Sequence, residues 1–154
     1  MKSIEYRYGN DLEVTAVIEL YNASGLGERR PVDDPEIFAD MIRHANLTVT
    51  AWDEDALVGI SRTLTDFSYV GYLFDLAVRR SHQKLGIGIE LIQKTREKMG
   101  PRSMLVLLSA PQAVEYYPRA GFTASERVGS AGGGSVSEGE VEDVSRKARD
   151  WALN

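Results

Sequence analysis

The chain has 154 residues, 43% of them hydrophobic, which is enough for one domain with a core of its own. It contains no cysteine, which excludes disulfides, a thiolate nucleophile and cysteine-based metal sites, and its net charge of -5 disfavours nucleic acid as a main partner. No apolar run approaches the roughly 20 residues that span a bilayer, and the N-terminus lacks the apolar stretch of a signal peptide, so we expect a cytoplasmic protein without a membrane role.

The first half of the chain predicts a strand, two helices and then three strands. Residues 2–7 alternate between apolar and polar side chains, which indicates a strand. Asn10 with Glu13 three residues later is typical of a capping box, so we expect a helix from there to about Asn22. A proline near the start and one apolar face predict a second helix over 34–46. Polar turns then separate three further segments, which predicts an antiparallel meander over 47–52, 56–64 and 69–78.

The second half of the chain begins with a polar, glycine-containing loop and a helix. Residues 87–99 have helical periodicity and end at a Gly-Pro pair. Residues 103–108 form a short, continuous apolar run, the pattern of a strand that is buried on both faces. A short helix over 112–119 and a closing strand at 121–122 follow. Together the elements predict the α+β class, with a mixed sheet flanked by helices.

The C-terminal end has a composition of its own. Residues 129–136 are rich in glycine and serine, as in a flexible linker, and they separate a domain over 1–128 from the segment 137–154. That segment starts with a second capping-box pattern and predicts an amphipathic helix, with an apolar stripe of Val141, Val144, Ala148, Trp151 and Ala152. Such a helix packs on its own domain or on a neighbour, and a frayed tail is the alternative.

The loop between the third strand of the meander and the next helix carries the strongest functional motif. Gln83, Gly86 and Gly88 stand in a Gln-x-x-Gly-x-Gly pattern immediately before the helix. A helix N-terminus presents unpaired N–H groups and a partial positive charge, and glycines let a phosphate approach the backbone closely. The same loop holds the basic cluster of this acidic chain, Arg79, Arg80 and Lys84. The loop is therefore a candidate pyrophosphate site.

Two common phosphate-binding motifs do not fit this loop. A dinucleotide-binding Rossmann motif would place its third glycine where the chain has Leu91. A P-loop would need Gly-Lys-Ser or Gly-Lys-Thr after the glycines, and neither follows. That the two glycines only shape a turn stays an alternative.

The motif resembles the acyl-CoA signature of the GNAT acyltransferases, Arg/Gln-x-x-Gly-x-Gly/Ala, which is matched by residues 83–88. A second family pattern, aromatic-Tyr-x-x-x-Gly-Phe, is matched by residues 116–122. The resemblance covers about residues 3–125 and is greatest to small bacterial and serotonin N-acetyltransferase-like members. It implies a central, mostly antiparallel sheet flanked by helices, from which the C-terminal linker and helix depart.

The resemblance implies an acetyl-CoA site and no metal. Backbone groups of Leu76, Ala77 and Val78 would pair with the pantetheine, as an added strand would. The pyrophosphate would lie against N–H groups of the residues that open the helix, namely Gln83, Lys84, Leu85, Gly86, Ile87, Gly88 and Ile89.

The family usually works by direct attack of a bound amine on the thioester, which requires an oxyanion donor, a proton acceptor and an acid for the thiolate. The resemblance suggests the N–H of Leu76 as the donor and Tyr117 as the acid, since a phenol has a pKa near 10. Asp75, in an apolar strand, is the candidate acceptor of the amine proton. As alternatives, Asp75 is a structural partner of a nearby arginine or of a backbone group, and Tyr117 only packs beneath the strand.

The leading hypothesis is an acetyl-CoA-dependent N-acetyltransferase that acts on a primary amine of a small molecule or peptide. Arg29 and Arg30 are candidate substrate-binding residues for an acceptor with a carboxylate or phosphate, and solvated loop charges are the alternative. A non-catalytic acyl-CoA sensor or partner-binding module is the rival function, and a nucleic-acid module ranks last. A homodimer is one candidate assembly.

Overall fold

The computed structural model describes residues 3–109, 113, 115–125 and 150–153. Contacts within the chain form two compact units, Met1–Ser103 and Met104–Asn154. The sequence placed a domain boundary at 128/129 instead, and that division stays a prediction. No helix in the described part of the chain is long and apolar enough to cross a membrane.

The first unit contains an antiparallel sheet in the order β1-β2-β3-β4. Its strands are β1 (Glu5–Tyr8), β2 (Leu47–Asp53), β3 (Ala56–Thr65) and β4 (Val70–Val78). The predicted meander is confirmed, with each strand bounded within one or two residues of the expected place. The first strand begins at Glu5 rather than at residue 2.

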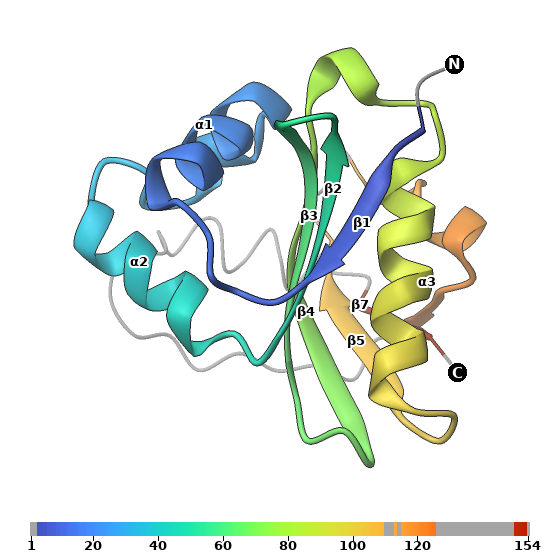
Figure 1. Cartoon of the computed structure of the whole chain (residues 1–154). Helices are drawn as coiled ribbons and strands as arrows, with labels where there is room; N and C mark the ends of the chain where they lie inside the picture. The colour runs from blue at the N-terminus through green and yellow to red at the C-terminus, as the bar shows by residue number, and fades with distance from the viewer. Residues whose placement is uncertain (1–2, 110–112, 114, 126–149, 154) are drawn as a thin grey trace, which may run out of the picture. The chain divides into compact units, whose positions relative to one another are not determined.

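Helices cover both faces of this sheet (Figure 1). On one face lie α1 (Val14–Ser24) and α2 (Pro35–His44), joined by a short 3-10 helix, Leu26–Arg29. On the other face lies α3 (Ile87–Met99), which contacts β2, β3 and β4 and has the bounds that its periodicity predicts.

The start of α1 differs from the prediction. The helix begins at Val14, with Glu13 as an N-cap that makes no side-chain capping bond, so the capping box predicted at Asn10 is wrong. The Asn10 amide instead donates to the carbonyls of Arg43 and Ala45, at 2.8 and 3.1 Å. The last carbonyls of a helix have no N–H donor within the helix, and the Asn10 side chain supplies the donor at the C-terminal end of α2. The Asn10 side chain therefore bonds a distant part of the chain instead of capping α1.

Each face of the sheet has its own apolar cluster. On the α1 and α2 side the buried members are Val17, Leu20, Tyr21, Phe38, Ile42, Leu57, Ile60 and Ala77. On the α3 side they are Val49, Ala51, Val58, Ile87 and Leu91. Outside the bulges, residues alternate between the two faces along the strands, so the sheet presents apolar side chains on both sides.

A β-bulge interrupts the pairing of β3 with β4. Arg62 pairs with Asp75, but the next residue, Thr63, pairs with Leu73, so Phe74 is the extra residue. The Arg62 guanidinium lies over the Phe74 ring and also bonds the Asp75 carboxylate. The bulge therefore turns two successive side chains of β4, Phe74 and Asp75, to the α1 and α2 face.

The second unit contains β5 (Met104–Leu108), β6 (Thr123–Ser125) and β7 (Asp150–Leu153), with β7 antiparallel to both others. In β5 burial alternates, with Leu105 and Leu107 buried and Leu108 41% exposed, so the predicted burial of both faces is wrong. In place of the helix over 112–119 the described residues form a 3-10 helix, Tyr117–Ala120. The closing strand follows the Gly-Phe pair instead of including it.

The C-terminal residues also differ from the prediction. Residues 150–153, the end of the helix predicted over 137–154, form a strand. β7 has backbone partners on both sides, and this tertiary pairing overrides a local helical pattern. The linker 129–136 and the rest of that helix lie outside the described residues.

Candidate active site

The loop from β4 to α3 is shaped by two left-handed residues. Gly86, with φ of 82°, is the N-cap of α3, and Lys84 has φ of 64°. No side chain caps the helix, and the first N–H that bonds within it belongs to Glu90, which donates to the Gly86 carbonyl. The preceding N–H groups, of residues 87–89, have no acceptor within the helix. A Cβ built on Gly86 meets no atom within 4 Å, so there is room in front of these donors.

Side chains tie this loop to the sheet. The Gln83 amide donates to the Val78 carbonyl at 2.9 Å, which joins the signature glutamine to the end of β4. His82 Nε2 lies 3.0 Å from a carboxylate oxygen of Asp53, and His82 Nδ1 lies 2.8 Å from the Ser81 hydroxyl. The loop is therefore held from two strands before any ligand arrives, which lowers the ordering cost of binding.

The basic side chains of the loop differ in their contacts. Arg79 pairs with Glu19 of α1 at 2.8 Å, and this hydrogen bond raises the pKa of Arg79. The guanidinium of Arg80 lies against the backbone of Gly25, where an added Cβ would come within 2.8 Å of its Nη2. Lys84 is exposed. Arg79 thus anchors the loop to α1, while Lys84 stays accessible to a ligand.

The predicted pantetheine-binding residues form the end of β4. Ala77 is buried on the α1 and α2 face, whereas Leu76 and Val78 pack against the α3 cluster. Their register with β3 is regular, with Leu76 opposite Ser61. The segment directly follows the bulge and directly precedes the glycine loop.

Asp75 is the centre of a buried charged cluster. One carboxylate oxygen accepts from Arg30 Nε at 2.6 Å. The other accepts from the Tyr21 hydroxyl at 2.6 Å and from Arg62 Nε at 2.7 Å. The carboxylate has no exposed surface. Two guanidinium groups and a phenol occupy both carboxylate oxygens, so these contacts favour the structural role that the sequence left as the alternative.

The protonation states in this cluster follow from its contacts. Burial, together with the charge of Asp75, raises the pKa of Tyr21 well above its usual value, so Tyr21 is neutral. Burial by itself lowers the pKa of Arg62, but the charge and hydrogen bond of Asp75 outweigh it and leave the pKa raised. The cluster therefore holds two cations, one anion and a neutral phenol.

The two predicted substrate-binding arginines are placed differently. Arg30 turns inward, with Nε on Asp75 and Nη2 donating to the Phe74 carbonyl at 3.0 Å. Its Nη1 donates to the carbonyl of Arg29 at 2.8 Å. Arg29 itself is exposed at the end of the 3-10 helix. The structure thus brings Arg30 to the strand that carries the site and leaves Arg29 at the surface.

Tyr117 belongs to the second unit, where it opens the 3-10 helix. Its ring makes edge contacts with Tyr116 and Phe122, with centroids 5.3 and 5.5 Å apart. Gly121, in the left-handed region with φ of 90°, ends this turn. The motif therefore forms a compact aromatic turn, and the acid role of Tyr117 stays a prediction.

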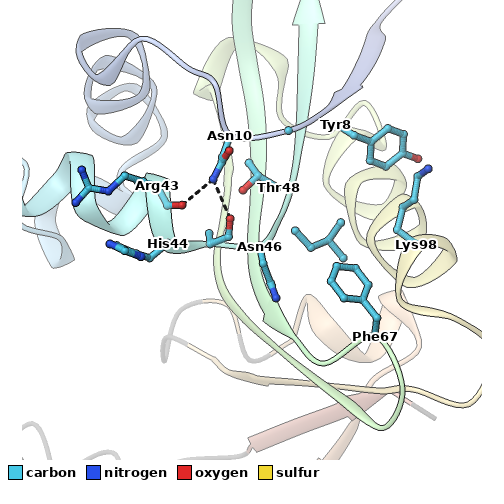
Figure 2. A pocket seen from close by; sticks show the side chains of 11 residues that line it. Tyr8, Asn10, Arg43, His44, Asn46, Thr48, Phe67 and Lys98 are labelled. Carbon is cyan, nitrogen blue, oxygen red and sulfur yellow. Dashed lines mark hydrogen bonds between the residues drawn. The ribbon is translucent and has the colours of Figure 1, made fainter.

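A surface cavity of about 550 Å³ lies elsewhere on the first unit (Figure 2). Tyr8, Phe67 and Lys98 line one side, and the end of α2 lines the other. Lys98 belongs to the last turn of α3, whereas the glycine loop precedes the first turn. None of the predicted site residues lines this cavity. Among the described residues, no group of three or more His, Asp or Glu side chains is arranged to hold a metal ion.

Comparison with protein families gives one match, the Acetyltransferase (GNAT) domain, over residues 21–136. The chain belongs to the GNAT acetyltransferase family. It is therefore an acyltransferase enzyme with an α+β fold, and both predictions are confirmed. The family match extends over residues 129–136, which the sequence set apart as a linker. Curated protein sequences gave no match.

Solved structures show the same fold. A probable acetyltransferase from meticillin-resistant Staphylococcus aureus is 22% identical, with a TM-score of 0.70 over 88% of this chain and 99% of that one. The PaiA N-acetyltransferase from Thermoplasma acidophilum, in complex with coenzyme A, is 15% identical, with a TM-score of 0.70 over 99% of both chains. An aminoglycoside acetyltransferase from an uncultured soil metagenomic sample, in complex with sisomicin, is 19% identical, with a TM-score of 0.64 over 85% of this chain and 95% of that one.

Two residues of this GNAT acetyltransferase were missed by the sequence analysis. Tyr21 lies within the predicted first helix and Arg62 within the predicted strand over 56–64, and neither was singled out. Arg62 did carry a signal, because a charged residue within a strand that is buried on both faces needs a partner of opposite charge. Asp75, in the neighbouring strand of the meander, is that partner.

Proposed function

We propose that this chain is an acetyl-CoA-dependent N-acetyltransferase that transfers acetyl directly to a primary amine of a small molecule or peptide. The observation that carries the proposal is the uncapped N-terminus of α3, which follows β4 through a glycine-shaped loop. The coenzyme A complex of the PaiA relative supports the choice of acyl donor.

The residues present fit a diphosphate group. The Gln83 N–H already donates to the Arg80 carbonyl, so the proposed cradle begins at Lys84 and continues to Ile89. These N–H groups, together with the positive end of the α3 dipole, favour an anion at this end of the helix. Lys84 adds an exposed cation, and the backbone from Leu76 to Val78 would hold the pantetheine arm.

Acetyl transfer requires few side-chain groups once the thioester is bound in position. The amine nitrogen attacks the thioester carbonyl carbon, the C–S bond breaks, the amine loses a proton and the leaving thiolate gains one. The Leu76 N–H is the proposed oxyanion donor and Tyr117 the proposed acid. Because the Asp75 carboxylate accepts hydrogen bonds from Arg30, Tyr21 and Arg62, we assign the amine proton to solvent and keep Asp75 as a positioning residue that fixes the bulge beside Leu76.

Isothermal calorimetry with coenzyme A tests the phosphate site. We expect wild-type protein to bind and Gly86→Glu to bind at least about tenfold more weakly, because the new side chain fills the space before the helix and adds negative charge. Gly9→Glu is the matched control, since Gly9 also has a positive φ and open space around it. Absence of wild-type binding, or an equal loss in both variants, would contradict the site.

Thiol release with a panel of amines then separates the enzyme from an acyl-CoA sensor. The proposal expects steady release of coenzyme A that depends on the amine and decreases at least about tenfold in Tyr117→Phe. A sensor would bind coenzyme A and release no thiol with any amine.

We also propose a cytoplasmic location and a homodimer. The first rests on the cysteine-free composition, which suits a reducing compartment. Analytical ultracentrifugation over a range of concentrations measures the second, and a single species with the mass of one chain would overturn it.

A further inference from the structure

A partly exposed apolar patch borders the charged cluster on the α1 and α2 face. It consists of Leu64, Tyr72 and Phe74 and is called the aromatic patch below. Leu64 and Phe74 are 40% and 38% exposed. The rings of Tyr72 and Phe74 meet edge to face with centroids 4.2 Å apart, and Leu64 pairs with Tyr72 in the sheet. Large apolar side chains gathered at one place on a surface mark a binding surface more often than scattered ones do.

The charged cluster holds this patch in place. Arg30 donates to the backbone carbonyl of Phe74 at 3.0 Å, and the Arg62 guanidinium lies 5.0 Å from the centre of the Phe74 ring. Phe74 reaches this face because it is the extra residue of the bulge. Phe74, the member of the patch nearest the site in sequence, lies one residue before Asp75 and two before Leu76, the proposed oxyanion donor.

The cluster also leaves a positive charge next to the patch. Two guanidinium groups face one carboxylate, and Tyr21 is neutral. The Arg30 side chain is 27% exposed, whereas Asp75 has no exposed surface, so a ligand meets the cation and not the anion. The Arg30 guanidinium donates to three acceptors among the described residues. These bonds use only part of its N–H groups, so donors remain for a further oxygen.

Carboxylates close in sequence do not cancel this charge. Glu28, Asp33 and Asp34 are exposed, where solvent screens them, and the Asp34 carboxylate accepts from the Ile37 N–H as the N-cap of α2. The exposed face of Arg30 thus remains the local cation that borders the patch.

From this juxtaposition we infer the acceptor class: an amine that carries a carboxylate and an apolar or aromatic body, such as an apolar amino acid. The inference rests on the proposed function and gives it a substrate. The body packs on the aromatic patch, the carboxylate pairs with Arg30, and the amine faces the thioester beside Leu76. A polycation is disfavoured, because the same guanidinium repels it.

The test measures thiol release with phenylalanine, with 2-phenylethylamine, which lacks only the carboxylate, and with spermidine as the polycation. We expect the highest kcat/KM with phenylalanine, and a kcat/KM at least about tenfold lower with spermidine. The two phenyl amines ionise differently in solution. The decisive quantity is therefore the change in their kcat/KM ratio between wild type and variant.

Arg30→Gln should reduce the preference for phenylalanine over 2-phenylethylamine about tenfold or more, and Arg30→Lys, which keeps the charge, should reduce it less. Phe74→Ser should reduce kcat/KM about tenfold for phenylalanine but little for alanine, which lacks a large body. Arg43→Gln and Tyr8→Ser, at an exposed arginine and a 45% exposed tyrosine outside the site, are the controls and should change neither ratio. Coenzyme A affinity, measured for every variant, checks that each one is folded.

Several outcomes overturn the inference. If spermidine is the best acceptor, or if Arg30→Gln leaves the ratio unchanged, the acceptor class is wrong while the acetyltransferase stands. If Phe74→Ser changes the sedimentation coefficient and not the acceptor ratios, the patch is an interface between copies of the chain. If wild type binds no coenzyme A, or binds it and acetylates no amine, the proposed function fails and the inference fails with it.

Discussion

The two faces of the sheet in the first unit bury different kinds of side chain. On the α3 face the buried side chains among the described residues are apolar or carry hydroxyl groups, of which Ser61 and Thr95 bond each other at 2.7 Å. The α1 and α2 face buries a carboxylate, a guanidinium and a phenol, with Arg30 at the edge. Buried ions are costly to desolvate and are a weak source of stability. The α3 face therefore stabilises the sheet by apolar packing, whereas the charges of the opposite face add little stability and are the ones to which we assign acceptor binding.

The largest effect is expected at the charged face. Asp75→Asn removes the only counter-charge that the described contacts give the buried Arg62, so we expect a loss of about 3–5 kcal/mol in the free energy of unfolding. Urea unfolding measures it. The control is Asp40→Asn in the surface pair with Arg43, which should cost about 0.5 kcal/mol or less. A loss below about 1 kcal/mol at Asp75 would contradict the cluster.

The apolar face should respond through packing. Leu91→Ala leaves a cavity under α3, since Leu91 is fully buried, and should cost about 3 kcal/mol. Unlike the variants of Arg30, it should leave the ratio of acceptor activities unchanged. Ile89→Ala, at a 40% exposed position of the same helix, is the control for stability and should cost about 1 kcal/mol or less. A changed acceptor preference in Leu91→Ala would show that the two faces do not act separately.

Tyr21→Phe tests the charged face through the pH dependence of the free energy of unfolding. It removes a hydrogen bond to a carboxylate and should cost about 1–3 kcal/mol at neutral pH. Because the folded state raises the pKa of Tyr21, the unfolded chain loses this proton first, near pH 10. Wild-type stability should therefore fall as the pH rises above 10, by up to about 1.4 kcal/mol per pH unit from this group. The variant should lack that part of the slope, and equal slopes in urea unfolding series would refute the assignment.

The smallest effect is expected at the hydroxyl pair. Thr95 donates to the Leu91 carbonyl at 2.8 Å, so Ser61 is the donor between the two hydroxyls. Ser61→Ala and Thr95→Val should each cost about 1 kcal/mol, and the double variant should cost less than their sum by about 0.5–1 kcal/mol. Additive losses in the double-mutant cycle would mean that the pair contributes no coupling.

The sequence was sufficient where local patterns decide the structure. The bounds of α3 follow from its periodicity and from the glycines at both ends, and polar turns mark the limits of β2, β3 and β4. The same local reasoning located the loop with Gln83, Gly86 and Gly88, because helix N-termini and glycines act on the residues next to them.

Only the tertiary structure decided the partners of Asp75. Tyr21 and Arg30 lie 54 and 45 residues away in the sequence, and no local pattern encodes a contact at that separation. The same holds for Asn10, whose amide bonds the end of α2 in place of a local cap, and for residues 150–153, which pair as a strand with β5 and β6. In each case a hydrogen bond made possible by packing outweighed the weak local preference, which is typically below 1 kcal/mol per residue.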